Sequence, residues 1–278
     1  MPTLNLPGAD LYYETVGSGP LLLCISGANG NYEIWKPLAI QLKKFFTVAM
    51  YDRRGFSRSY LTGAQDYSRR IETDADDAQS LIKHLSPEEP ATVVGNSSGA
   101  IVGLVLLQRH PEAVRMLVAH EPPAYSLLSD FERRKKEQQE VYDIYRASGV
   151  FPAAERFADL IEAGDEKPGL LSNFDPRSGP YISSNTQYWF ERELLFYPLY
   201  EHDLRKLKEQ KGKLILANGK ASKPGVGHLL TGEALGDAFG IGVRMFTGGH
   251  VGFAPFAREW AQELRGYLKK ENTFYSFC

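Results

Sequence analysis

Short apolar runs recur along the chain and are bounded by glycine, proline, asparagine or aspartate. Such runs are typical of buried strands, because a strand covered on both faces needs no polar alternation. The first two runs look like a hairpin pair. We predict eight strands: Thr3–Leu6, Asp10–Val16, Leu21–Ile25, Phe46–Tyr51, Ala91–Val94, Val114–Ala119, Lys213–Ala217 and Val243–Phe246.

Between these runs lie longer segments in which apolar residues return every three or four positions, as on the buried face of a helix. Ile71–Leu85 has this spacing, Ala100–Gln108 follows a glycine-rich turn, and Phe256–Leu268 closes the chain with a similar pattern. Strands that alternate with helices build a mostly parallel sheet with helices on both faces. The predicted fold class is therefore α/β.

The alternation stops between about Pro122 and Leu207, where helical patterns replace the strands. This stretch is rich in aromatic residues: residues 125–200 hold 14 of the chain's 33 Phe, Tyr and Trp. We predict that residues 122–207 form an inserted helical cap. Residues 1–121 and 208–278 then form one core domain.

Composition and charge limit the classes of partner. With 43 % hydrophobic and 24 % charged residues, the chain is an ordinary globular protein. Thirty-two Lys and Arg against 34 Asp and Glu give a net charge of −2, which offers no global electrostatic case for a nucleic-acid or anionic-membrane partner.

Cysteine usage and the apolar runs suggest where the protein resides. Cys24 and Cys278 provide neither a disulfide framework nor a metal clip. The first residues do not resemble a secretory signal, and no apolar run approaches the ~18 residues of a membrane span. We expect a cytoplasmic protein that needs no membrane, and we leave a homodimer open.

The sequence Gly95-Asn96-Ser97-Ser98-Gly99 matches the pattern G-x-S-x-G and lies between a predicted strand and a predicted helix. A sharp turn in that place lifts the serine hydroxyl above the carboxyl edge of the sheet, and the two glycines give the turn room. Ser97 is therefore a candidate nucleophile.

With this motif the chain resembles the α/β-hydrolase family over nearly its whole length. The resemblance includes Ser26-Gly27 after the third strand and Asp52-Arg53-Arg54-Gly55-Phe56-Ser57-Arg58-Ser59 after the fourth. Ser26 stands where the family usually has His, and Ser57 where it usually has Gly. The resemblance implies an α/β-hydrolase fold with an eight-stranded sheet, and an oxyanion hole formed by the amide of Ser98 and that of Gly27 or Ala28.

A serine needs a base to remove its proton, and six histidines compete for that role. His250 follows the last strand and precedes the closing helix, where the family carries its catalytic histidine. His110 ends a helix, as a dipole partner would. His84, His202 and His228 lie in segments without a comparable loop.

The acid departs from the usual pattern, because Ser222 stands where the family places an aspartate after the seventh strand. The best substitute is Glu121, immediately after the sixth strand, which would fix the tautomer of His250. The surroundings of Ser97 and Glu121 resemble the zearalenone-hydrolase type of lactonase, which also takes its acid from this place. The alternative is that Glu121 only caps the start of the insertion.

No metal or cofactor is expected. His120 and Glu121 are adjacent, but no second group of His, Cys, Asp or Glu at ligand spacing accompanies them, and the phosphate-binding glycine loops are missing. The resemblance to the lactonases suggests Trp189 as a substrate contact. Packing of Trp189 with Tyr188 and Phe190 between cap and sheet is the alternative.

These residues predict a cofactor-independent serine hydrolase that cleaves an ester or lactone of a small apolar molecule with Ser97, His250 and Glu121. The same scaffold also supports carbon–carbon bond cleavage and other non-hydrolytic reactions, and a receptor with slow turnover would keep the same triad.

Overall fold

A computed structural model describes residues 2–272 and 274–275 of the chain. Its centre is a twisted sheet whose strands follow the order β1-β2-β4-β3-β6-β7-β8-β9, with the short β5 paired to β2 beside this path. The strands from β4 to β9 in this order run parallel, and β2 pairs antiparallel with β1, β4 and β5. Their bounds are β1 Thr3–Leu6, β2 Ala9–Gly17, β3 Leu21–Ile25, β4 Thr47–Tyr51, β5 Tyr60–Leu61, β6 Ala91–Asn96, β7 Val114–His120, β8 Leu214–Gly219 and β9 Val243–Phe246.

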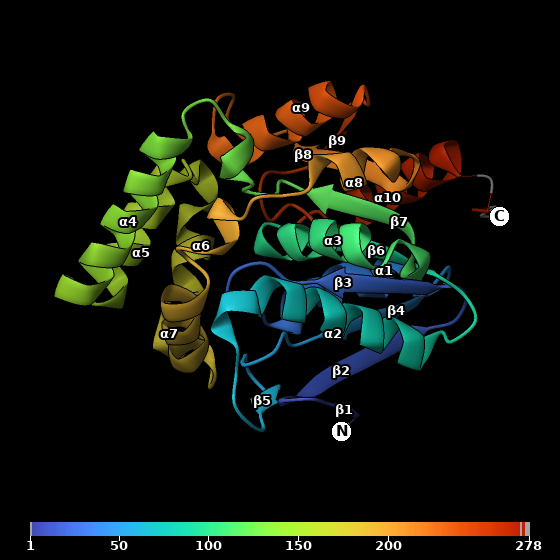
Figure 1. Cartoon of the computed structure of the whole chain (residues 1–278), viewed down its shortest axis with the longest axis horizontal. Coiled ribbons are helices and arrows are strands. Elements are labelled where there is room, and N and C mark those ends of the chain that lie inside the picture. The colour runs from blue at the N-terminus through green and yellow to red at the C-terminus, as the bar shows by residue number, and fades with distance from the viewer. Residues whose placement is uncertain (1, 273, 276–278) are drawn as a thin grey trace.

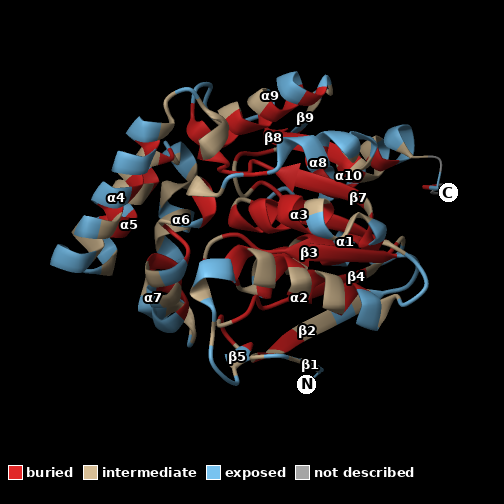
Figure 2. Ribbon diagram, in the orientation of Figure 1, coloured by how far each residue is buried: buried red, intermediate tan, exposed pale blue. Residues whose placement is uncertain are grey.

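Helices cover both faces of the sheet (Figure 1). One apolar cluster joins α2 and α3 to one face, and a second joins α1 and α10 to the other. Figure 2 shows the central strands β4, β3, β6, β7 and β8 mostly buried, whereas β1, β2 and β5 are partly exposed and the outer helices keep exposed faces. The helices are α1 Lys36–Leu42, α2 Arg70–Leu85, α3 Ser98–Arg109, α4 Phe131–Ser148, α5 Val150–Leu160, α6 Lys167–Ser172, α7 Ile182–Arg192, α8 Leu204–Glu209, α9 Gly227–Phe239 and α10 Ala257–Glu271.

The fold confirms the predicted α/β class and the eight-stranded path of the sheet, with β5 as an addition that the sequence did not indicate. A strand of two residues, Tyr60–Leu61, carries no periodic signal. The central strand β3 is buried at all five positions, as its uninterrupted apolar run implies. Cys24 lies in this strand as a buried free thiol, whereas Cys278 is outside the described residues.

Between β7 and β8 the chain forms α4 to α8, and α4 to α7 lie together at one end of the sheet, on the side to which β7 points (Figure 1). These helices share an apolar cluster of their own, which includes Phe174, Trp189 and Phe190, and Phe56 of the core packs into it. The inserted segment therefore covers the carboxyl ends of the parallel strands, where α/β proteins carry their sites.

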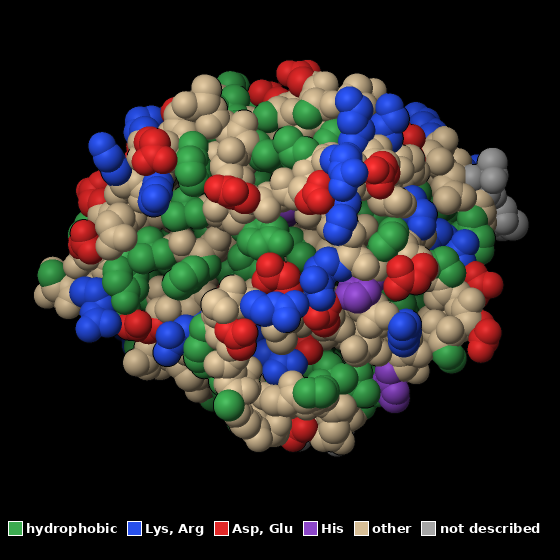
Figure 3. Space-filling view, in the orientation of Figure 1, with side chains coloured by type: hydrophobic (Ala, Val, Ile, Leu, Met, Phe, Trp, Pro, Cys, Tyr) green, Lys and Arg blue, Asp and Glu red, His purple; other side chains and the backbone are tan. Residues whose placement is uncertain are grey.

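Charged side chains of both signs are mixed on the face shown in Figure 3, and hydrophobic side chains gather near its centre and toward α4 to α7. None of the described helices is both long and apolar enough to cross a membrane.

Candidate active site

Ser97 occupies a strained turn between β6 and α3. Its backbone has φ 55° and ψ −125°, a region that side chains with a Cβ rarely adopt. The Ser97 amide donates to the carbonyl of His120, at a distance of 3.0 Å, which ties the turn to the neighbouring strand β7. This is the strained strand-to-helix geometry that exposes a nucleophilic serine.

The two glycines of the motif, Gly95 and Gly99, let backbone segments approach each other closely. The residue with a positive φ in this turn is Ser97, not either glycine. A Cβ on Gly95 would lie 2.4 Å from the carbonyl oxygen of Gly99, and a Cβ on Gly99 would lie 2.2 Å from that of Ile25. Both contacts are with backbone, which cannot move aside. The glycines therefore let β6, α3 and β3 meet closely enough for the turn to form.

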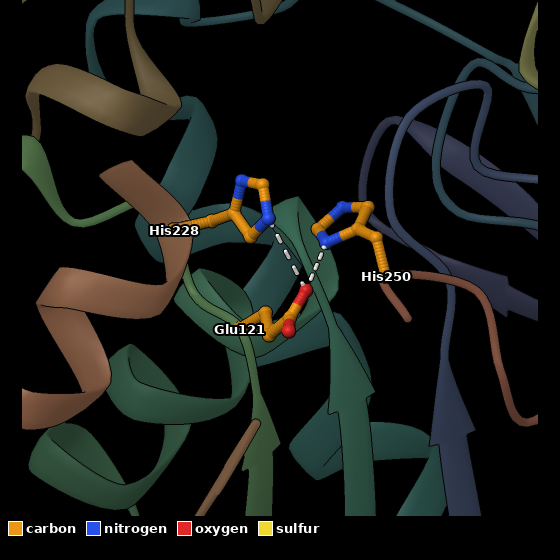
Figure 4. A group of neighbouring side chains, drawn as sticks. All are labelled: Glu121, His228 and His250. Atoms are coloured by element: carbon orange, nitrogen blue, oxygen red, sulfur yellow. Dashed lines mark hydrogen bonds and ion pairs between the residues drawn. The ribbon is translucent and has the colours of Figure 1, made fainter. Parts of the chain in front are cut away.

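His250 lies in the loop between β9 and α10, and its Nδ1 is 2.7 Å from Oε2 of Glu121 (Figure 4). The two residues are 129 positions apart in the sequence. Asn96, beside Ser97, donates from Nδ2 to the carbonyl of His250 at 2.8 Å. The turn that carries Ser97 thus also fixes the loop that carries His250.

Glu121 is completely buried directly after β7, with φ 47°. Its Oε1 accepts hydrogen bonds from the backbone N–H of Gly219 at 2.8 Å and from the Ser222 hydroxyl at 2.5 Å. Burial alone would raise the pKa of the Glu121 carboxyl, but the hydrogen bond from His250 contributes most to lowering that pKa well below its usual range. Glu121 is therefore ionised, and the Ser222 hydroxyl, at the position where the family usually has an aspartate, donates to its carboxylate.

His228, at the start of α9, is a third member of this group that the sequence did not reveal. Its Nε2 lies 3.4 Å from Oε2 of Glu121, and its ring centre is 4.5 Å from that of His250 (Figure 4). Burial lowers the pKa of His228 to about 3, so the ring is neutral at neutral pH. No local pattern marks this residue, because the packing of α9 against β8 brings it here.

Glu121, His228 and His250 each offer one ligand atom, and these atoms lie within 4.8 Å of one another. An imidazole–imidazole–carboxylate set suits Zn²⁺. A metal bound there would occupy Nδ1 of His250 and the Glu121 carboxylate, the same two atoms that bond to each other in the structure.

The loop after β3 carries Gly27 and Ala28, two of the residues expected from the sequence to form an oxyanion hole. Gly27 and Ala28 line a cavity with Ser97, and Ala28 and Ser98 line a second one with Ser97. The Ser26 hydroxyl donates to the carbonyl of Asn31 at 2.8 Å, so this departure from the family pattern still holds the loop.

Ser57, the second departure, takes a φ of 47° where the family has glycine. Its amide donates to Oδ1 of Asn185 on α7 at 2.8 Å, and Nδ2 of Asn185 donates to the Ser57 hydroxyl at 2.9 Å. These two bonds compensate for the unusual backbone conformation and join the core to the inserted helices.

Arg53 connects the loop that carries Gly27 with the inserted helices. The fully buried guanidinium donates to the carbonyl of Gly27 at 2.8 Å, to Asp74 of α2 at 2.8 Å, and to both carboxylate oxygens of Glu193 at 2.7 Å. Burial raises the pKa of Glu193 despite its bonds to Arg53. Glu193 follows α7, so the end of this helix is fixed to the loop that carries Gly27.

Three cavities meet at His250. The inner cavity has a volume of about 30 Å³ and is lined by Ser97, Ser98, Ala28, Gln138, Trp189 and His228, among others. Two outer cavities, of about 320 and 330 Å³, are both lined by Ile161 and Leu170. Both outer cavities include His250 and Val251 in their walls.

Trp189 is 3 % exposed and contacts the rings of Phe157, Phe174 and Phe190 with centroid separations of 5.0, 5.5 and 4.8 Å. It also lines the inner cavity. The two interpretations of this residue are therefore compatible, since one ring packs the inserted helices and faces the cavity beside Ser97.

Comparison of the sequence with known proteins agrees with this fold. Residues 20–190 match the family described as the alpha/beta hydrolase fold, which is more than half of the chain. The chain belongs to the α/β-hydrolase family. Among curated proteins, it is 31 % identical over 275 residues to a protein of Bacillus subtilis (strain 168) described as the uncharacterized hydrolase YraK, covering 97 % of this chain and 96 % of that protein.

Solved α/β-hydrolase structures share the fold. Est816, described as an N-acyl homoserine lactone degrading enzyme, aligns with a TM-score of 0.73 at 20 % identity and covers 96 % of this chain and 100 % of its own. A thermophilic esterase from Thermogutta terrifontis aligns with a TM-score of 0.72 at 18 % identity, over 98 % of this chain and 99 % of its own. At these identities the likeness concerns the fold.

The other candidate histidines have contacts elsewhere. His84 bonds to Tyr13, and His202 to Gln108. His110 lies at the carboxyl end of α3, as expected, and its Nε2 is also 2.7 Å from Asp76 of α2. None of these three lines the inner cavity.

Proposed function

We propose that the protein is a serine hydrolase that cleaves esters or lactones, with Ser97 as nucleophile, His250 as base and Glu121 as the acid that orients the base. The observation that carries the proposal is the 2.7 Å contact between His250 Nδ1 and Glu121 Oε2, in a histidine that lines the same cavity as the strained Ser97. The description of the YraK relative as a hydrolase supports a hydrolytic reaction.

In this mechanism His250 Nε2 removes the proton of Ser97 Oγ while Oγ attacks the carbonyl carbon. The oxyanion accepts hydrogen bonds from the amide of Ser98 and from that of Gly27 or Ala28. The intermediate collapses, the leaving alkoxide takes the proton from His250, and the acyl group stays on Ser97. Water then attacks the acyl-enzyme, with His250 again as base, and releases the carboxylic acid.

The structure shows no hydrogen bond between the Ser97 hydroxyl and the His250 ring within the described part of the chain. Catalytic hydrogen bonds are often long before substrate binds and tighten in the complex. Glu121 fixes Nδ1 of His250 as the protonated nitrogen, so Nε2 is the one left to act as base.

The acid after β7 is the feature that the chain shares with the zearalenone-hydrolase type of lactonase, and we extend the proposal to that type. Glu121 has its four neighbours in place for this role: His250, His228, Gly219 and Ser222. If Glu121 only capped the start of the insertion, its 2.7 Å contact with His250 would remain unexplained.

We propose that residues 122–207 act as a cap that forms one wall of the substrate site, with Trp189 as a contact for apolar substrate. Phe157, Ile161 and Trp189 of this segment line the inner cavity. Apolar surface buried against them contributes roughly 25 cal/mol for each Å². The two outer cavities, about ten times larger than the inner one, are the places for the bulkier part of a substrate.

The proposal is tested by Ser97→Ala with a panel of aryl esters, lactones and β-diketones. We expect the variant to lose on the order of 10³-fold or more in kcat and to keep its thermal unfolding curve, because the hydroxyl contributes chemistry rather than packing. A fluorophosphonate should add its mass to the wild type only.

Turnover of β-diketones without turnover of esters would instead assign a carbon–carbon bond-cleaving enzyme. Tight binding without turnover would assign a receptor. Equal ester hydrolysis by the variant and the wild type would exclude Ser97 as the nucleophile.

A further inference from the structure

Gln138, on α4, lines the inner cavity together with Ser97 and His250. The residue is only 1 % exposed, and its Oε1 is buried without a hydrogen-bond partner in the protein. The walls nearby are apolar and include Phe157, Leu194 and Pro198. A buried amide in such surroundings is unfavourable unless something supplies its missing bond.

Other buried polar atoms in the described residues also lack partners, and they allow a comparison. Thr186 Oγ1, Tyr188 OH and His202 Nε2 are of this kind, yet these residues do not line the inner cavity. Gln138 is the one residue of that group, within the described ranges, that both has an unpartnered polar atom and lines the cavity beside Ser97. Its partner therefore has to be an occupant of that cavity.

The inner and outer cavities suit different parts of a substrate. Both of the larger outer cavities include His250 in their walls, and His250 delivers a proton to the leaving group in the proposed mechanism. These cavities have room for the leaving group. The inner cavity includes the oxyanion-hole candidates Ala28 and Ser98 and has a volume of about 30 Å³. A short acyl group fits this place, with its carbonyl at Ser97.

We propose that Gln138 selects short acyl groups that carry a hydrogen-bond donor, a hydroxyl or an amide N–H, a few atoms from the scissile carbonyl. This inference rests on the proposed function and names the substrate class of the same site. Gln138 Oε1 accepts the bond from the donor. A site that bonds a substrate hydroxyl disfavours the analogue that lacks it, because the amide oxygen is then left buried without a partner.

The experiment compares two isosteric esters, 4-nitrophenyl 3-hydroxybutyrate and 4-nitrophenyl 3-methylbutyrate, which differ by a hydroxyl in place of a methyl group. In the wild type we expect kcat/KM to favour the hydroxy ester about tenfold. Gln138→Leu, which has a similar shape, should abolish this preference through loss on the hydroxy ester. Gln139→Leu is the matched control, because Gln139 is the exposed neighbour on α4 and donates to Asp143.

Two further measurements separate the outcomes. Thermal unfolding should show Gln138→Leu at least as stable as the wild type, since an unpartnered amide is removed, whereas a structural glutamine would leave a less stable variant. Binding of the two esters to Ser97→Ala, followed by calorimetry, should show the same preference without any turnover.

Hydrolysis of both esters with equal kcat/KM, unchanged in Gln138→Leu, would overturn the inference and leave the serine-hydrolase proposal intact. Absence of hydrolysis and of fluorophosphonate labelling would contradict the serine-hydrolase proposal. In that case the binding ratio in Ser97→Ala would still decide for or against Gln138, and equal affinities would decide against it.

Discussion

At the scale of single residues, the two oxygens of the Glu121 carboxylate have different tasks. Oε2 contacts His250, while Oε1 is held by the amide of Gly219 and the hydroxyl of Ser222. A carboxylate held on one oxygen presents the other in a fixed direction. The orientation of His250 therefore depends on Ser222 through one intermediate residue.

We predict that Glu121→Gln lowers kcat by about 10²–10⁴-fold, because an amide can bond the wrong imidazole tautomer. Ser222→Ala removes one of two donors to Oε1 and should lower kcat by about 10-fold with little effect on KM. Steady-state kinetics on the best ester measure both. Ser184→Ala is the control, since its hydroxyl donates to the carbonyl of Tyr181, three residues earlier. A larger loss from Ser222→Ala than from Glu121→Gln would contradict the assignment of Glu121 as the acid.

The sequence allows prediction of site residues that have a recognisable motif or position beside them. It gives no means to predict residues that only the fold brings to the site. Ser97 has a motif, His250 has a loop position, and Glu121 follows a strand. His228 and Gln138 lie on helices whose patterns give no hint of a site, and they reach it through the packing of α9 and α4. Long-range packing is what a pattern of neighbours leaves undetermined.

At the scale of elements, the carboxyl end of α7 is anchored by the buried pair between Arg53 and Glu193. Breaking one side of a buried ion pair leaves an uncompensated charge, which costs several kcal/mol. The same guanidinium donates to the carbonyl of Gly27, so its displacement would disturb the loop that we propose to supply an oxyanion donor.

We predict that Glu193→Gln lowers the free energy of unfolding by about 3 kcal/mol and lowers kcat more than it raises KM. Denaturant unfolding and steady-state kinetics measure the two effects. Glu191→Gln, on the same helix, is the matched control, because Glu191 pairs with the exposed Arg146 and its loss should leave both quantities nearly unchanged. Equal behaviour of the two variants would show that Arg53 is not the anchor.

Elements differ in how far the sequence could define them. The long amphipathic α2 and the uninterrupted strand β3 were predicted to within a residue, because burial on one face or on both leaves a periodic trace. The helix α1 has seven residues and was missed, as was α9, which is buried at many positions around its axis and shows little amphipathic contrast. Short or evenly buried elements take their form from the neighbours on which they pack.

At the scale of the whole molecule, buried histidines make stability depend on pH. Burial lowers the pKa of His202 from 6.5 to about 4, so the unfolded chain binds a proton between these values that the folded chain does not. Within this window the free energy of unfolding falls as pH falls, by at most about 1.4 kcal/mol per pH unit for this one group. Well above pH 6.5 the His202 imidazole is neutral in both the folded and the unfolded chain, so it no longer makes stability depend on pH.

We predict that His202→Asn makes the free energy of unfolding less dependent on pH between about pH 4 and 6.5. The reduction in slope should correspond to the uptake of about one proton fewer on unfolding. The asparagine carbonyl can still accept the bond that Gln108 Nε2 makes with His202 Nδ1, at 2.8 Å. Urea unfolding at several pH values measures the slope. Parallel curves for the variant and the wild type would mean that His202 does not contribute.

The buried contact between Arg53 and Glu193 also limits how such enzymes can be recombined. A chimera that takes its inserted helices from a relative replaces the residue opposite the Arg53 guanidinium, while Asp74 and the Gly27 carbonyl stay with the recipient. A donor without a carboxylate at that position would leave the buried Arg53 cation with two of its four hydrogen bonds. Exchange of the inserted helices among relatives therefore requires that Glu193 and Arg53 be inherited as a pair.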